Sequence, residues 1–170
     1  MVNSKSKGSE YERKVAKILG SWWGEEFHRT PMSGGLHWHE DNRVSGDIVT
    51  PPGSLYPFTT ECKKREGWSF EQILKGTGEV EEWWKQSTGD SKRVGLLPLV
   101  VFAKNFSPNY MMLTESVFNS ILKYKGTETT PFNYFILHRP KFPTRVVCVL
   151  DEFIKFVTKD DVIGALAKEK

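Results

Sequence analysis

Apolar residues recur at helix and strand spacings in alternating segments along this 170-residue chain. A spacing of three to four residues predicts a helix over residues 11–22, opened by a capping box of Ser9 and Glu12 and ended at Gly24. Other segments predict helices over 69–75, 79–87 and 115–123 and near the C-terminus, and strands over 47–49, 58–63, 97–102, 111–113, 132–138 and 145–150. This order predicts an α/β fold, with a mixed central β-sheet flanked by helices in a single domain.

The domain organisation follows from where these patterns begin and change. Residues 1–8 are expected to form a flexible basic arm, and residues 9–170 a single domain. Its core spans about 9–105, and about 106–170 form a C-terminal extension of the same domain. Residues 29–46 are rich in Gly, Ser, His and Asn and are expected to form a loop.

Composition excludes several classes of protein. The apolar run 96–103 is far shorter than the roughly 20 residues of a membrane span, and the N-terminus lacks the apolar core of a secretory signal. Two cysteines cannot build a disulfide framework. The sequence contains no phosphate-binding loop ending in Gly-Lys-Ser/Thr, so we expect no nucleotide cofactor. We therefore expect a cytoplasmic protein with reduced thiols and no membrane partner, whose net charge of +3 permits a polyanionic ligand.

Two carboxylates and a lysine carry the candidate chemistry. Asp47 follows a glycine at the start of one predicted strand, and Glu61 lies on the next strand, which we expect to pair with it. Lys63 falls on the same face as Glu61, roughly 7 Å further along. Mg²⁺ commonly takes one or two carboxylates, so Asp47, Glu61 and the main-chain carbonyl of Cys62 could hold it. Lys63 could then orient an attacking water or stabilise charge on a phosphate.

These residues resemble the metal-binding core of the PD-(D/E)XK nuclease superfamily, written here as G-D-x(13)-E-C-K from Gly46 to Lys63. Residues 7–13 (KGSEYER) resemble the K-G-x-x-x-E-R opening of its archaeal-type (Hjc-like) Holliday junction resolvases. Arg29, followed by Ser33-Gly34-Gly35, is similar to an arginine and a serine-glycine loop in those enzymes. Residues 84–86 (WKQ) and the strand over 97–102 are similar to phage-encoded members. The resemblance covers about residues 7–105.

The resemblance implies a restriction-endonuclease-like fold and a Mg²⁺-dependent endonuclease, with Mn²⁺ able to substitute. It implies a homodimer that resolves four-way DNA junctions by symmetric cleavage, encoded by a phage and acting in the host cytoplasm. The implied catalytic residues are Glu12, Asp47, Glu61 and Lys63, with Glu12 a further candidate metal ligand. The residues expected to contact DNA are Lys7, Arg13, Arg29, Ser33, Lys64 and Arg65, and Gln86 is expected to support the site.

Alternatives remain open for the substrate and for individual residues. The same core could serve a restriction-like or repair nuclease acting on linear DNA, redirected by the long loop over residues 34–46, or a nucleic-acid-binding module without catalysis. Glu12 could act only as a capping carboxylate. His37-Trp38-His39 could bind zinc, although a DNA-contacting loop fits better because no cysteine is near.

Overall fold

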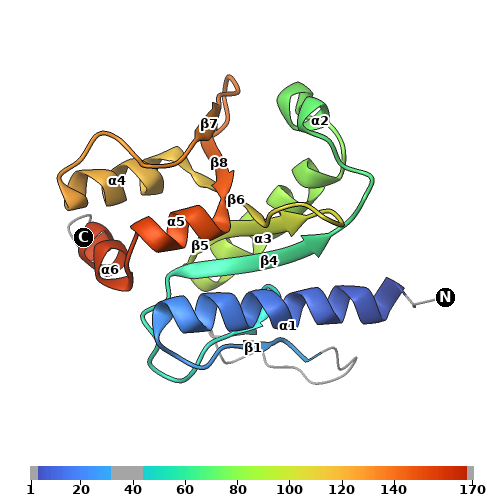
Figure 1. Ribbon diagram of the computed structural model, residues 1–170, viewed down its shortest axis with the longest axis horizontal. Coiled ribbons are helices and arrows are strands. Elements are labelled where there is room, and N and C mark those ends of the chain that lie inside the picture. Colours follow the sequence, from blue (N-terminus) through green and yellow to red (C-terminus); the bar gives the residue numbers. More distant parts are fainter. Residues whose placement is uncertain (1–3, 32–43, 168–170) are drawn as a thin grey trace. The chain divides into compact units, whose positions relative to one another are not determined.

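A computed structural model describes residues 4–31 and 44–167 of the chain (Figure 1). The chain divides into two compact units, Met1–Asn105 and Phe106–Lys170, which are described separately. Within the described residues, no helix is both long and apolar enough to cross a membrane.

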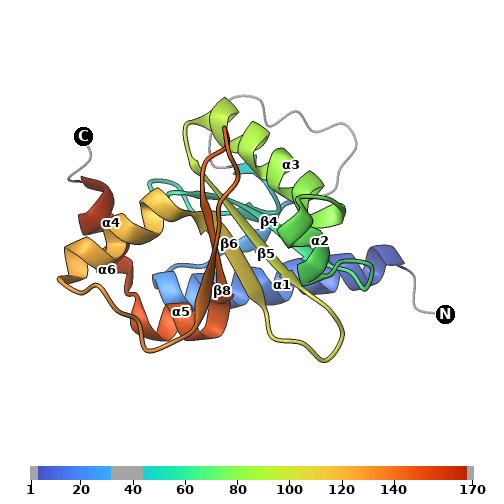
Figure 2. The ribbon, with the colours of Figure 1, turned by 90° about the horizontal axis from the view of Figure 1, so that it is seen from above.

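The first unit is built around two parallel strands. It contains the helices α1 (Ser4–Trp23), α2 (Phe70–Lys75) and α3 (Glu79–Val94) and the strands β1 (His28–Arg29), β2 (Val44–Ser45), β3 (Ile48–Val49), β4 (Phe58–Lys64) and β5 (Leu97–Ala103). β4 pairs in parallel with β5, from Phe58 opposite Leu97 to Lys64 opposite Ala103. α1 and α3 cover opposite faces of this pair (Figures 1 and 2). Both strands are therefore buried over most of their length.

Aromatic side chains pack the segments before and after β4 against neighbouring elements of this unit. The ring of Trp23, at the end of α1, meets that of Tyr56 with centroids 5.3 Å apart. On the other side, Trp68 contacts Phe102 of β5 at 4.9 Å, and its indole Nε1 donates to the carbonyl of Ala103. These contacts fix the ends of β4, which carries the candidate catalytic residues.

The second unit contains antiparallel strands and helices. β6 (Tyr110–Thr114) and β7 (Tyr134–Leu137) each pair antiparallel with β8 (Arg145–Val149). The helix α4 (Glu115–Lys125) contacts β6 and β8 and also packs on α6 (Lys159–Ala167), while α5 (Leu150–Phe156) follows directly on β8. The predicted α/β fold, with parallel and antiparallel strands flanked by helices, is confirmed. A single domain over residues 9–170 stays a prediction.

Two predictions of local structure were wrong. α1 begins at Ser4, so residues 4–8 are helical rather than part of a flexible arm, and the Ser9 side chain does not open a helix. The expected pairing of the strand after Asp47 with the strand of Glu61 is also absent, because β3 pairs with β1 and β2 instead. An isolated parallel bridge between Gly46 and Thr60 joins the two segments.

Candidate active site

Asp47 lies on a tight turn that packs against the free edge of β4. The Asp47 amide donates to the Thr60 carbonyl at 2.8 Å, and the Cys62 amide donates to Asp47 Oδ2 at 2.8 Å. Thr30, which directly follows β1, stabilises the turn. Its amide donates to the Asp47 carbonyl at 2.9 Å, and its hydroxyl donates to the Gly46 carbonyl at 2.9 Å. Asp47 is thus held at β4 through its own amide and its carboxylate, although β3 does not pair with β4 as a strand.

Gly46 permits this close approach. Its φ of +68° lies in the left-handed region, and a Cβ at this position would lie 2.6 Å from the Thr60 carbonyl oxygen. Any other residue would clash with backbone that cannot move without opening the bridge. The glycine before the aspartate is therefore a geometric requirement of the site.

Glu61 and Lys63 share one face of β4, as the alternation of a strand predicts. Lys63 Nζ lies 3.2 Å from Glu61 Oε2, and the Glu61 side chain is 1% exposed. Apart from this ion pair, both Glu61 carboxylate oxygens lack a hydrogen-bond partner among the described residues. A buried carboxylate whose oxygens lack hydrogen bonds is costly, which makes Glu61 a candidate ligand for a cation.

The electrostatics of Glu61 reflect this burial. Removal from water raises the pKa of Glu61 to about 8, and the negative charge of Asp47 contributes to the rise. Lys63 lowers the pKa, and Asp90 on α3, which sequence reasoning missed, adds to the rise. Acidic residues on a helix are common, so no pattern in the sequence singled out Asp90.

Cys62 offers its main chain to the same edge. Within an extended strand, the N–H and C=O groups of one residue point to the same side. Because the Cys62 amide points to Asp47, its carbonyl also faces the Asp47 edge, away from β5. The thiol is buried and free, and burial raises its pKa well above the usual value. Only the main chain of Cys62 is therefore suited to hold a cation.

The set of oxygens fits a hard divalent cation. Asp47 and Glu61 supply two carboxylates, and Cys62 supplies a carbonyl, which matches the one or two carboxylates that Mg²⁺ usually takes. Among the residues that the structure describes, no group of three or more His, Cys, Asp or Glu side chains is arranged to hold a metal ion. Glu12 therefore does not complete a three-acid cluster.

Glu12 pairs with Arg29 instead. Arg29 Nε lies 2.5 Å from Glu12 Oε2, and each side chain is only 16% exposed. Burial raises the pKa of Glu12 and the charge of Asp47 adds to this, while Arg29 and Lys63 oppose it. The capping role considered for Glu12 is excluded, because it lies in the interior of α1. The predicted contact of Arg29 with DNA stays a prediction, and in this structure its guanidinium pairs with Glu12.

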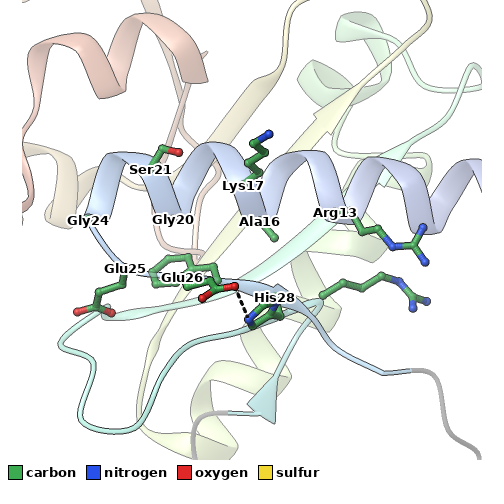
Figure 3. A pocket seen from close by; sticks show the side chains of 11 residues that line it. Arg13, Ala16, Lys17, Gly20, Ser21, Gly24, Glu25, Glu26 and His28 are labelled. Atoms are coloured by element: carbon green, nitrogen blue, oxygen red, sulfur yellow. Dashed lines mark ion pairs between the residues drawn. The ribbon is translucent and has the colours of Figure 1, made fainter.

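Of the other predicted DNA contacts, Arg13 lies on α1 beside a cavity of about 590 Å³. Figure 3 shows Arg13 and Lys17 projecting from α1, with the ion pair of Glu26 and His28 on the facing segment. Ser33, most of the loop over 34–46 and His37-Trp38-His39 lie outside the described residues.

Lys7, Lys64 and Arg65 line a second groove, between α1 and the end of β4. Gln86 is exposed on α3 and makes no hydrogen bond to Asp47 or Glu61, both of which lie in the described part of the chain. Its neighbour Ser87 is buried instead, with its hydroxyl 3.2 Å from the Thr59 carbonyl. The structure thus brings Asp47, Glu61 and Lys63 together and leaves Gln86 apart.

Comparison with known proteins agrees with this geometry. No curated protein and no solved structure matches the chain. A family model described as "Phage putative PDDEXK endonuclease" matches residues 3–164, which is nearly the whole chain. The match spans all the residues of the site, and the site itself has the aspartate, glutamate and lysine after which PD-(D/E)XK nucleases are named. The chain therefore belongs to this phage family of PDDEXK endonucleases, and its general activity is that of a nuclease.

Proposed function

We propose that this protein is a divalent-metal-dependent DNA endonuclease that resolves four-way junctions. The observation that carries the metal dependence is the buried carboxylate of Glu61, whose two oxygens have no hydrogen-bond partner among the described residues apart from the ion pair of Oε2 with Lys63. It lies close enough to Asp47 for that charge to raise its pKa. Two mutually repelling carboxylates are stabilised when a cation binds between them.

Asp47, Glu61 and the Cys62 carbonyl would hold the cation, with Mg²⁺ as the expected metal and Mn²⁺ as a substitute. When bound, a divalent cation lowers the pKa of water and neutralises charge on the phosphoryl oxygens. Lys63 is the one cation that the structure places within 4 Å of Glu61 among the described ion pairs. Its ammonium can orient the attacking water and stabilise the negative charge that develops on the phosphate.

The preference for junctions is supported by the resemblance of residues 7–13 to the opening of the junction resolvases. Symmetric cleavage of a junction needs two sites, so this proposal includes a homodimer. The family match fits a nuclease of linear DNA equally well. The complete set of Asp47, Glu61 and Lys63 argues against a non-catalytic binding module.

The test compares cleavage of a labelled immobile four-way junction with cleavage of linear duplex of the same sequence, in Mg²⁺ and in EDTA. Asp47→Asn keeps an oxygen that can accept from the Cys62 amide, so it should fold and bind DNA. Losing a ligand carboxylate should slow cutting by about 10²–10⁴-fold. Asp151→Asn, at an exposed position on α5, is the matched control and should cut normally.

Each result has a distinct meaning. Paired symmetric nicks in the junction alone support a resolvase. Equal cutting of linear duplex retains the nuclease and rejects the junction preference. A folded wild-type protein that cuts neither DNA in Mg²⁺ or Mn²⁺ rejects the proposed function.

A further inference from the structure

A basic groove lies beside the candidate active site and has no role in the chemistry described so far. It has a volume of about 660 Å³ and runs between α1 and the segment that follows β4. α1 contributes Lys7, Glu10, Tyr11 and Lys14, and the opposite wall consists of Lys64, Arg65, Glu66 and Asn105. Every lining residue belongs to the first unit.

The charge of the groove favours an anion. Four cations face two carboxylates, and one of these, Glu66, already accepts a hydrogen bond from the Asn105 amide at 2.8 Å. Within residues 4–31 and 44–167, none of the four cations takes part in an ion pair. Their charges are therefore available to a ligand, and they come from both walls.

The walls are held in place before any ligand binds. The Arg65 amide donates to the Ala103 carbonyl at 3.1 Å, which ties the segment after β4 to the end of β5. Tyr11, which belongs to α1, is 4% exposed. A site with a fixed backbone loses less conformational entropy on binding, so modest charge contacts suffice for affinity.

The position of the groove along β4 relates it to the site of cleavage. Strand residues rise about 3.3 Å each, so the backbone of Lys64 and Arg65 lies roughly 10–13 Å beyond that of Glu61. Side chains alternate between the two faces of a strand, so Lys64 points away from the face of Glu61 and Lys63 and lines the groove beside α1. The groove therefore adjoins the end of β4 immediately after the candidate catalytic lysine.

We propose that this groove binds backbone phosphates of the substrate DNA on one side of the scissile phosphate, with Lys14 as a contact that no sequence motif indicated. The proposal rests on the proposed nuclease function and extends it by defining the path of the substrate. Such contacts position DNA without reading its sequence.

The test measures DNA binding without cutting, in the Asp47→Asn protein. Lys7→Ala, Lys14→Ala and Arg65→Ala are combined, and Lys123→Ala, an exposed lysine on α4, is the control. Removing one cation that binds a phosphate should reduce the slope of log K against log salt by about 1. The triple variant should therefore show a slope smaller by about 2–3, and the control should keep the slope of the Asp47→Asn protein.

A second measurement locates the contact on the DNA. Duplexes carrying a single neutral methylphosphonate are scanned along the cleaved strand on both sides of the scissile position. With groove residues intact, a methylphosphonate at a position confined to one side of the scissile phosphate should weaken binding about 2–5-fold, as expected for an exposed charge pair. In the Lys14→Ala protein, the same methylphosphonate should leave the DNA affinity nearly unchanged.

The outcomes separate this proposal from the function on which it rests. A triple variant with the slope of the control, or a methylphosphonate effect unchanged by Lys14→Ala, overturns the groove while wild-type cleavage still stands. A folded Asp47→Asn protein that binds no DNA, together with a folded wild-type protein that cuts none, overturns both. Thermal unfolding of each variant checks that the substitutions in the groove leave the fold intact.

Discussion

Replacing Glu61 by glutamine removes a negative charge that the fold has buried. The side chain is 1% exposed, and its pKa is raised from 4.5 to about 8, first by burial and then by the charge of Asp47. Glutamine has nearly the same shape but carries no charge. The substitution therefore tests directly whether this protein stores free energy at its candidate metal site.

The sign and size follow from proton linkage. Below pH 4.5 the carboxyl is protonated in both the folded and the unfolded chain. Above that pH the unfolded chain releases its proton while the folded chain keeps it, so the free energy of unfolding falls by about 1.4 kcal/mol per pH unit. The decrease stops near pH 8, where the folded protein also ionises. The full pKa shift of Glu61 corresponds to a decrease of roughly 5 kcal/mol in the free energy of unfolding. Rotation of the side chain toward water would reduce this decrease to about 2 kcal/mol.

The assay is equilibrium unfolding in urea with EDTA, at pH 5 and at pH 9. The stability of Glu61→Gln relative to wild type should rise by about 2–4 kcal/mol between these two pH values. Glu128→Gln, at an exposed position, controls for the loss of one carboxylate. A difference between Glu61→Gln and wild type that is the same at pH 5 and pH 9 would refute the reasoning.

Binding of a divalent cation should offset the destabilisation caused by ionised Glu61. At pH 9, Mg²⁺ at about 100 times its dissociation constant should stabilise the wild-type protein by about 2.7 kcal/mol. Glu61→Gln should gain far less at the same concentration. Equal stabilisation of both proteins would place the metal elsewhere.

Three further substitutions test the surroundings of the site. Gly46→Ala should lower the free energy of unfolding by at least about 2 kcal/mol in urea titrations, because Gly46 has a φ of +68° and the added Cβ would meet the Thr60 carbonyl. A decrease below about 0.5 kcal/mol would contradict the close approach of Gly46 to Thr60. Arg29→Gln should lower the free energy of unfolding by about 1–3 kcal/mol at pH 8, because it leaves Glu12 partly buried and unpaired. Adding Glu12→Gln to the same chain should recover part of this loss. Additive effects of the two substitutions would show that Arg29 and Glu12 do not interact. Lys63→Met should reduce cleavage by about 10²–10³-fold while leaving DNA affinity within about 2-fold in filter binding; parallel decreases in both would show that Lys63 acts only in binding.

Local patterns in the sequence predicted much of the fold. The strand predicted over 58–63 is β4, and the strand over 97–102 is β5, each within one residue at its end. Strand alternation predicted that Glu61 and Lys63 share a face, and their 3.2 Å contact confirms it. Such predictions succeed because they depend only on neighbours in the sequence.

Element ends and short strands were less predictable. The capping box at Ser9 competes with a helix that can extend further, since Lys5 and Lys7 are good helix formers and no proline stops them. α1 accordingly begins at Ser4. β1 and β2 have two residues each and exist only because β3 pairs with them, so a local pattern contains no signal for them.

The sequence by itself determined the chemical groups of the site and their order: an aspartate after a flexible glycine, then a glutamate and a lysine two residues apart. Only the tertiary structure decided that Glu61 is buried without hydrogen-bond partners among the described residues, and that Glu12 pairs with Arg29, 17 residues away. It also decided that Lys14 faces Lys64 and Arg65 across one groove. The physical reason is that burial and pairing depend on how distant segments pack, whereas residue type and spacing define only what each segment can offer.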